Sequence, residues 1–258
     1  TINDAGTGAN NTTLNVDATS GSVTIANAIT VANQGSGTVT IGTVTASGSN
    51  QSIYSGAISL AKGVTILNGA AGDRLQFSGG ITGTGDVTVD GISNTVKTVL
   101  IGAANTFSGN IYITGNGRLQ LSDGSATATS LLPDSASVNL NTSGGVFNLA
   151  KGGNNETIDA LNGVAGTSVN AVSGSDTLTL GSNGGSGSFA GNITGSLTLT
   201  KTGAGTQSLS GTNTYTGATT TISGGTLAIS GGYAIPDAGT VSIANTAKLQ
   251  VNANETIS

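Results

Sequence analysis

Acidic side chains are the main source of reactive groups in this chain, which has 12 Asp and Glu residues but no His and no Cys. Asp86 and Asp90 flank Thr88, and all three share one face of a strand if Val87 and Val89 point inward. Paired carboxylates on a strand could bind Ca²⁺ or perform acid–base chemistry. The same pattern also occurs on an ordinary solvent-exposed strand face. We expect that arrangement here.

The other acidic residues fall in patterns typical of turns. Asp73-Arg74 follows Ala-Ala-Gly and is predicted to form a turn. Asp134 and Asp237 each follow a proline, which predicts the Pro-Asp centre of a type I turn. Asn155-Glu156 recurs as Asn254-Glu255, and we interpret both pairs as polar corners between strands.

Nucleophilic and phosphate-binding chemistry lack the residues that they need. Ser and Thr are abundant, but no His is present to activate them and no Cys to replace them. The glycine-rich segment 181–187 lacks the Gly-Lys-Ser/Thr ending and the following helix of a phosphate loop. We therefore expect no catalytic, cofactor-binding or metal-binding residues in this chain.

Aromatic residues are few, with four Phe and four Tyr. Phe77 and Phe189 occupy matching positions in two similar segments, as do Phe107 and Tyr215. Matching positions in two copies indicate stacking inside the fold rather than a platform for sugars. The tyrosines without such a counterpart are Tyr54, Tyr112 and Tyr233.

Alternation of apolar and polar residues with a period of two runs through the chain and predicts many short strands. No segment shows a helical apolar period over the length of a helix. An antiparallel sandwich or barrel and a parallel β-helix both accommodate short strands. We favour the β-helix, because Gly, Asn and Ser punctuate the strands continuously and Thr dominates the alternating positions. Coils of roughly 20 residues, about 4.8 Å apart, would give about 12 coils and a rod of about 60 Å.

An internal duplication predicts tandem modules at about 77–158 and 189–257, within one continuous solenoid over residues 1–258. Six segments recur in the same order: 77–83 with 189–195, 105–109 with 213–217, 118–122 with 226–230, 132–134 with 235–237, 137–140 with 240–243, and 155–158 with 254–257. The offset between the copies shrinks along the chain, since position 77 matches position 189 but position 155 matches position 254. Retained strands with drifting turns are typical of a solenoid.

Charge and composition exclude several classes of partner. The net charge is −5 and the seven basic residues are spread along the chain, which argues against binding to nucleic acid or anionic lipid. No apolar run approaches the roughly 20 residues of a membrane-spanning helix. The sequence begins without Met and without a charged-then-apolar leader, so we expect a piece of a larger protein.

One stretch carries an ordered motif. Residues 199–206 read Leu-Thr-Lys-Thr-Gly-Ala-Gly-Thr, residues 209–217 read Leu-Ser-Gly-Thr-Asn-Thr-Tyr-Thr-Gly, and residues 224–227 read Gly-Gly-Thr-Leu. Together they make 196–230 resemble the passenger-associated transport repeat of bacterial autotransporters. Gln207 departs from the family, which usually has an apolar residue there. The resemblance implies a right-handed, single-stranded parallel β-helix in which Lys201 has an architectural role.

The resemblance also implies a function. Autotransporter passengers leave the cell through an outer-membrane translocator barrel and are displayed on the surface of diderm bacteria. The chain would then be a non-catalytic stalk, adhesin or coat segment, with a host surface or another copy of itself as a further partner. Two alternatives stay open: a polysaccharide lyase or hydrolase, which needs clustered carboxylates, and a self-assembling filament subunit, since the ends of a β-helix are open sheet edges.

Overall fold

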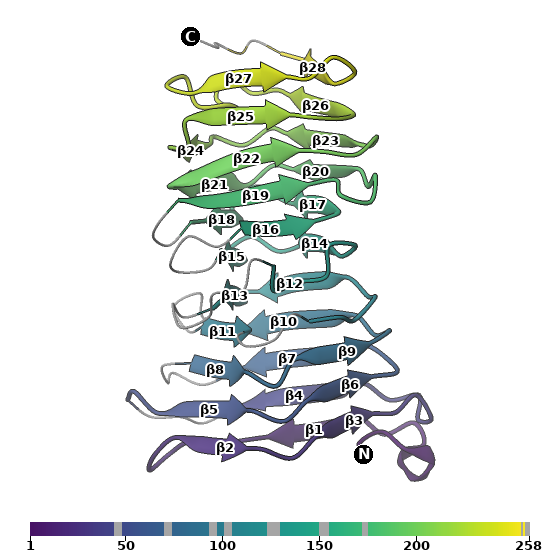
Figure 1. The fold of residues 1–258 in the computed structure, drawn as a ribbon. Helices are drawn as coiled ribbons and strands as arrows, with labels where there is room; N and C mark the ends of the chain where they lie inside the picture. The colour runs from purple at the N-terminus through teal and green to yellow at the C-terminus, as the bar shows by residue number, and fades with distance from the viewer. Residues whose placement is uncertain are drawn as a thin grey trace.

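Parallel β-strands wind into a three-sided solenoid whose two termini lie at opposite ends (Figure 1). The computed structural model describes residues 1–43, 48–69, 74–92, 97–100, 105–122, 130–149, 155–171, 175–253 and 255. Within these residues the only helical element is the 3₁₀ turn η1 (Ala5–Thr7). The predicted all-β parallel solenoid is confirmed, while the right-handed sense of the coil stays a prediction.

The largest sheet, here called face one, holds eleven strands in the described chain. Its strands, in spatial order, are β1 (Thr12–Asn15), β4 (Val39–Thr43), β7 (Val64–Asn68), β10 (Val87–Gly91), β12 (Ile111–Gly115), β14 (Ser137–Leu140), β17 (Ala160–Gly163), β20 (Gly187–Phe189), β23 (Thr206–Leu209), β26 (Thr226–Ile229) and β28 (Lys248–Val251). Each strand between the two end strands pairs in parallel with a strand of the preceding coil and one of the following coil.

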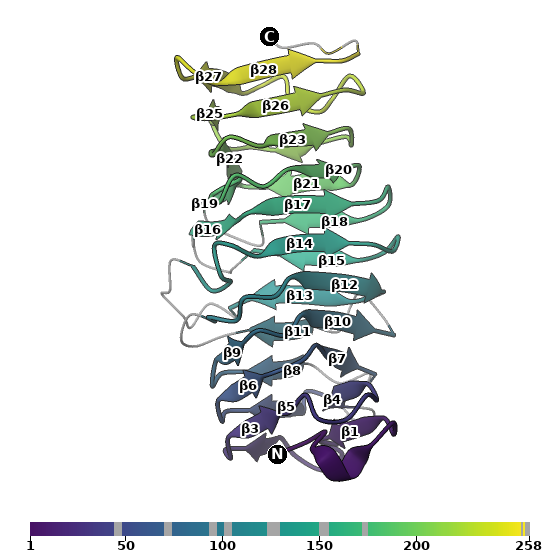
Figure 2. The ribbon, with the colours of Figure 1, turned by 90° about the vertical axis from the view of Figure 1, so that its right-hand side faces the viewer.

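Face two is a nine-stranded sheet, and face three consists of a three-stranded and a five-stranded sheet stacked along one side (Figure 2). Face two contains β2 (Val23–Ile25), β5 (Gln51–Tyr54), β8 (Arg74–Phe77), β11 (Lys97–Leu100), β13 (Arg118–Leu121), β15 (Val146–Asn148), β18 (Ser168–Asn170), β21 (Asn192–Gly195) and β24 (Thr214–Tyr215). Face three contains β3 (Ile29–Val31), β6 (Ile58–Leu60) and β9 (Ile81–Gly83), then β16 (Asn155–Ile158), β19 (Asp176–Leu180), β22 (Leu197–Lys201), β25 (Thr219–Ile222) and β27 (Thr240–Ile243).

Coil length varies along the chain, and the shortest coils of face one lie near the C-terminal end. On face one, Thr12 pairs with Val39 near the N-terminus, whereas Thr206 pairs with Thr226, a much closer position in the sequence, near the C-terminus. Most coils are longer than the expected length of roughly 20 residues. The described part of face one therefore has eleven strands rather than about 12 coils. Ten steps of about 4.8 Å give a stack of about 48 Å, shorter than the expected rod of about 60 Å.

The alternation along each strand separates the core from the surface. In β22, Leu197 and Leu199 are fully buried, while Thr198 and Thr200 alternate with them on the outer side. Each coil covers the apolar side chains of the coil before it, so a continuous core runs along the axis. Short strands are stable here because burial comes from stacking and not from strand length.

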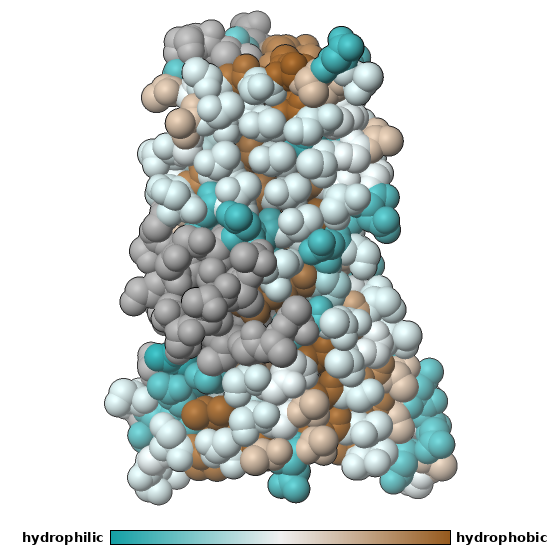
Figure 3. Space-filling model, in the orientation of Figure 1, coloured by the Kyte–Doolittle hydropathy of each residue, from teal (hydrophilic) through white to brown (hydrophobic). Residues whose placement is uncertain are grey.

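Threonines form outward ladders on face three, as expected from the sequence. Thr177 and Thr179 of β19 lie in register with Thr198 and Thr200 of β22, and Thr221 of β25 continues the second column. Over these strands the surface is mostly weakly polar, as the pale colour in Figure 3 shows. The ladder positions β-branched side chains where they pack well on a pleated surface.

Glycine is required in the turn after β22. Gly203 has a φ of +58°, and a Cβ there would lie 1.9 Å from the carbonyl oxygen of Gly181 in the preceding coil. Only glycine permits this backbone conformation so close to another main chain. The Lys-Thr-Gly sequence of the motif therefore marks a place where two turns stack directly.

Candidate functional site

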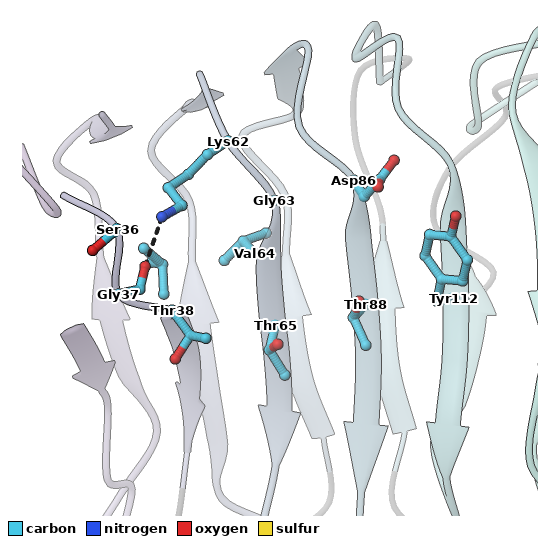
Figure 4. A pocket seen from close by; sticks show the side chains of 11 residues that line it. Ser36, Gly37, Thr38, Lys62, Gly63, Val64, Thr65, Asp86, Thr88 and Tyr112 are labelled. Atoms are coloured by element: carbon cyan, nitrogen blue, oxygen red, sulfur yellow. Dashed lines mark hydrogen bonds between the residues drawn. The ribbon is translucent and has the colours of Figure 1, made fainter. Parts of the chain in front are cut away.

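A groove of about 380 Å³ lies on face one, across the start of β4, β7, β10 and β12 (Figure 4). Thr65 and Thr88 are register partners, and Tyr112 follows Thr88 in the next strand, so the three form one outward row. Lys62 and Asp86 lie on the turns that lead into β7 and β10. The groove therefore gathers hydroxyls, one aromatic ring, one ammonium and one carboxylate from successive coils.

Both charged groups of this groove also support the main chain. The Lys62 Nζ donates to the carbonyl oxygens of Gly35 at 2.9 Å and Gly37 at 2.6 Å, which ties two coils together. The Asp86 Oδ1 accepts the N–H of Asn110 at 2.7 Å. Two of the three ammonium protons and one carboxylate oxygen are thus engaged, and the rest of each group is open to a ligand.

Asp86 and Asp90, which the sequence suggests as a possible carboxylate pair, have different surroundings in the structure. Val87 and Val89 are fully buried, so Thr88 and the two acids do share the outer side. Asp86 lies in the groove, but Asp90 accepts the N–H of Gly91 at 2.8 Å and is not among the residues that line the groove. The structure therefore brings Asp86 together with Lys62 and Tyr112, which the sequence did not connect.

In the described chain, the strands of face three are interrupted between β9 and β16. The buried side chain of Asn105 bridges this interruption. The N–H of Ile81 donates to Asn105 Oδ1 at 2.8 Å, and Asn105 Nδ2 donates to the carbonyl of Leu131 at 2.6 Å. The next coil completes the bridge, because Glu156 accepts the N–H groups of Leu131 at 2.9 Å and Leu132 at 3.0 Å. Two side chains thereby supplement the few main-chain bonds that remain between these coils, such as that from the N–H of Thr106 to the carbonyl of Ile81 at 2.9 Å.

The second module contains the same arrangement. The N–H of Ile193 donates to Asn213 Oδ1 at 2.8 Å, and Asn213 Nδ2 donates to the carbonyl of Ala234 at 2.7 Å. Glu255 then accepts the N–H of Ile235 at 2.9 Å. These residues are the counterparts of those in the first bridge, so the duplication extends to individual hydrogen bonds.

The two copies face different sides of the solenoid. β8, β9, β13 and β14 lie on faces two, three, two and one, whereas their counterparts β20, β21, β26 and β27 lie on faces one, two, one and three. Every counterpart is displaced by one face in the same sense. The second copy is thus rotated by one face about the axis, because the offset between the copies is not a whole number of coils.

The first Asn-Glu pair is not the polar corner that the sequence suggests. Asn155 and Glu156 lie in β16, and Glu156 is only 3% exposed. Burial raises the pKa of the Glu156 carboxyl to about 8, against the opposing effect of its hydrogen bonds from main-chain N–H groups. Glu156 faces inward because it replaces a strand partner, which local sequence does not reveal. Asn254 lies outside the described residues, as does Asp73 of the predicted Asp73-Arg74 turn.

The proline turns are present but shifted by one residue. Ala136 donates its N–H to the carbonyl of Pro133, and Gly239 donates to that of Pro236. Each proline is therefore the first residue of its turn, and the aspartate that follows, Asp134 in the first case, is one of the two central residues. The predicted Pro-Asp centre is wrong in register, while the repeated turn itself is confirmed.

Lys201 and Gln207 are both buried in the main-chain framework. The Lys201 Nζ donates to the carbonyls of Thr202, Gly203 at 3.1 Å and Gly224 at 3.4 Å, so it closes the turns of two coils. Burial lowers the pKa of this ammonium. These bonds agree with the architectural role expected for Lys201.

Gln207 reaches across an entire coil. Its Oε1 accepts the N–H of Leu161 at 3.2 Å and its Nε2 donates to the Leu161 carbonyl at 2.8 Å. Gly187, the register partner of Gln207, lies between them, and a Cβ on it would be 2.6 Å from the Gln207 Oε1. A polar residue at this buried position is therefore paired as a strand residue would be.

Most aromatic side chains are buried, as expected. Tyr54 stacks on Phe77 with ring centroids 5.1 Å apart and planes inclined by 6°. Phe107 and Phe189 are 1% exposed, and Tyr215 donates or accepts a 2.8 Å hydrogen bond with Thr220. The sequence did not predict the partnership of Tyr54 with Phe77, because their contact joins neighbouring coils of face two.

Two further kinds of site are absent from the described residues. In this part of the chain, no group of three or more His, Cys, Asp or Glu side chains is placed to hold a metal ion. None of its residues belongs to a helix with the length and hydropathy needed to span a lipid bilayer.

Comparisons with known proteins identify one family. Residues 199–229 match the passenger-associated-transport-repeat family, which confirms the resemblance inferred for 196–230. Comparisons with curated proteins and with solved structures each give no match. The transport repeat and the parallel solenoid are together consistent with an autotransporter passenger.

Proposed function

We propose, with the transport repeat at 199–229 as the premise, that this chain is a non-catalytic structural and adhesive segment of an autotransporter passenger on a bacterial surface. The match to the repeat is the observation that carries this proposal. The solenoid supports it, because stacked coils extend a rod without requiring disulfides or a large globular core. The polysaccharide-degrading alternative has less support, since the groove on face one contains one acid and one lysine.

The repeat would act during export through an outer-membrane translocator barrel. Residues 206–251 form short coils, so a coil that emerges closes a short loop before it pairs. Leu199 and Leu227 then become fully buried, and each such burial contributes roughly 1.5–3 kcal/mol before entropy is subtracted. Folding outside the cell would therefore oppose backward movement of the chain.

The test compares two equally buried pairs in the full-length protein in its own cell. Leu199→Asp with Leu227→Asp disrupts the repeat, whereas Val39→Asp with Ile41→Asp disrupts face one near the other end. We expect the first pair to reduce surface display more strongly, as measured by protease accessibility on intact cells. Equal display of the two double variants would remove the export role from the repeat.

A further inference from the structure

The groove on face one owes its depth to a missing side chain. Gly63 lies between Thr38 and Asp86 in the row of residues that immediately precede β4, β7 and β10. A Cβ on Gly63 would have no atom nearer than 3.6 Å, so neither the backbone nor its neighbours require glycine there. The missing side chain therefore leaves a hollow in the groove, although the fold would accept a larger residue at position 63.

The remaining walls present an ordered set of contact groups. Thr65, Thr88 and Tyr112 lie in one row, with about 4.8 Å between neighbouring strands. Figure 4 shows Tyr112 at one end of the row and Lys62 leaning toward Gly37 at the other. A ligand along the groove would run parallel to the solenoid axis and contact the four strands β4, β7, β10 and β12 over about 14 Å.

The charges of the groove balance. Lys62 retains one ammonium proton beyond its two carbonyl bonds, and Asp86 retains one carboxylate oxygen. One donor and one acceptor of opposite charge suit hydroxyl groups, which both donate and accept, better than an anion or a cation. The half-buried ring of Tyr112 offers an apolar face next to a polar hydroxyl.

We propose that this groove binds a neutral oligosaccharide, with one sugar ring on Tyr112 and hydroxyls hydrogen-bonded to Asp86, Lys62 and the threonine row. The proposal names the partner for the adhesive part of the proposed function and rests on it. The arrangement is that of many ligand sites, in which an apolar surface carries affinity and a few polar groups fix orientation. Binding breaks no glycosidic bond, so the single carboxylate of the groove is sufficient for this role.

The experiment measures binding of cellotetraose, maltotetraose, mannotetraose and xylotetraose to the purified chain by ligand-observed NMR and calorimetry. Tetragalacturonate is the charged comparison. Tyr112→Thr extends the threonine row without the ring, and Gly63→Gln fills the hollow without straining the backbone. Tyr233→Thr, at a tyrosine that is 58% exposed in a different coil, is the matched control. Circular dichroism confirms the fold of each variant.

We expect at least one neutral tetrasaccharide to bind, and both groove variants to weaken it by about tenfold or more, while Tyr233→Thr leaves it unchanged. Absence of binding to every neutral tetrasaccharide, binding of tetragalacturonate alone, or equal binding by Tyr112→Thr would overturn the proposal. Surface display of Tyr112→Thr is measured separately on intact cells. Normal display of Tyr112→Thr with weakened binding would separate the saccharide site from export. A wild-type chain that is displayed normally but binds no tetrasaccharide contradicts the saccharide site only, whereas equal display of the Leu199/Leu227 and Val39/Ile41 double variants contradicts the export role.

Discussion

Replacing Asn213 with alanine removes a side chain that satisfies two buried main-chain groups in neighbouring coils. The N–H of Ile193 loses its acceptor at 2.8 Å, and the carbonyl of Ala234 loses a donor at 2.7 Å. Asn213 is 3% exposed, so water cannot easily replace the amide. Each orphaned buried group costs about 1–3 kcal/mol, and we expect Asn213→Ala to cost about 4 kcal/mol in total.

The duplication supplies a repeat of the same experiment. Asn105→Ala should cost less, about 2 kcal/mol, because the N–H of Ile81 loses its acceptor but the carbonyl of Leu131 keeps the main-chain N–H of residue 105 as a donor at 3.1 Å. Asn139→Ala is the control. Asn139 donates to two main-chain carbonyls as well, but it is half-buried on the outer side of β14, where water can take its place. We expect that control to cost less than about 1 kcal/mol.

Hydrogen exchange is the suitable assay, because a solenoid is stabilised between neighbouring coils and opens locally. The amide of Ile193 should exchange about a thousandfold faster in Asn213→Ala, and that of Ile81 about thirtyfold faster in Asn105→Ala. Urea unfolding gives the accompanying loss of stability. If both amides stay as protected as in the wild type, and the midpoints shift no more than in Asn139→Ala, the bridging role of these asparagines is wrong.

Two further predictions concern buried polar groups. The pKa of Glu156 is higher in the folded chain, about 8, than its ordinary 4.5, so the folded state holds more protons between these values. The free energy of unfolding should therefore fall as pH rises from 4.5 to 8, by up to about 4 kcal/mol, in urea titrations. Glu156→Gln should remove that pH dependence although it lowers stability throughout, and a flat wild-type profile would contradict the burial argument. Gly187→Ala should displace Gln207 from Leu161 and lower the free energy of unfolding by about 2–3 kcal/mol. Gly63→Ala, where there is room for a Cβ, should change it by no more than about 0.5 kcal/mol. Equal losses in the two variants would refute the packing argument.

Local alternation in the sequence was enough to predict which residues face the core. Leu197 and Leu199 are buried and Thr198 and Thr200 lie outside, because successive residues of a strand point to opposite sides whatever the strand pairs with. The transport repeat at 199–229, and with it the architectural role of Lys201, could be predicted from the sequence for a related reason. Their signal is a local order of strand, glycine turn and strand.

Only the tertiary structure decided how coils meet. The length of each coil, which varies along the chain and is shortest in coils near the C-terminal end, sets which side chains become neighbours, and it depends on turns that the alternation does not specify. The buried role of Glu156, the rotation of the second copy by one face, and the meeting of Lys62, Asp86 and Tyr112 all follow from that register. The two recurring Asn-Thr-aromatic segments, which begin at Asn105 and Asn213, indicated in the sequence where the two bridges lie. Their meaning required the coils to be stacked, because each bridge satisfies main-chain groups of other coils.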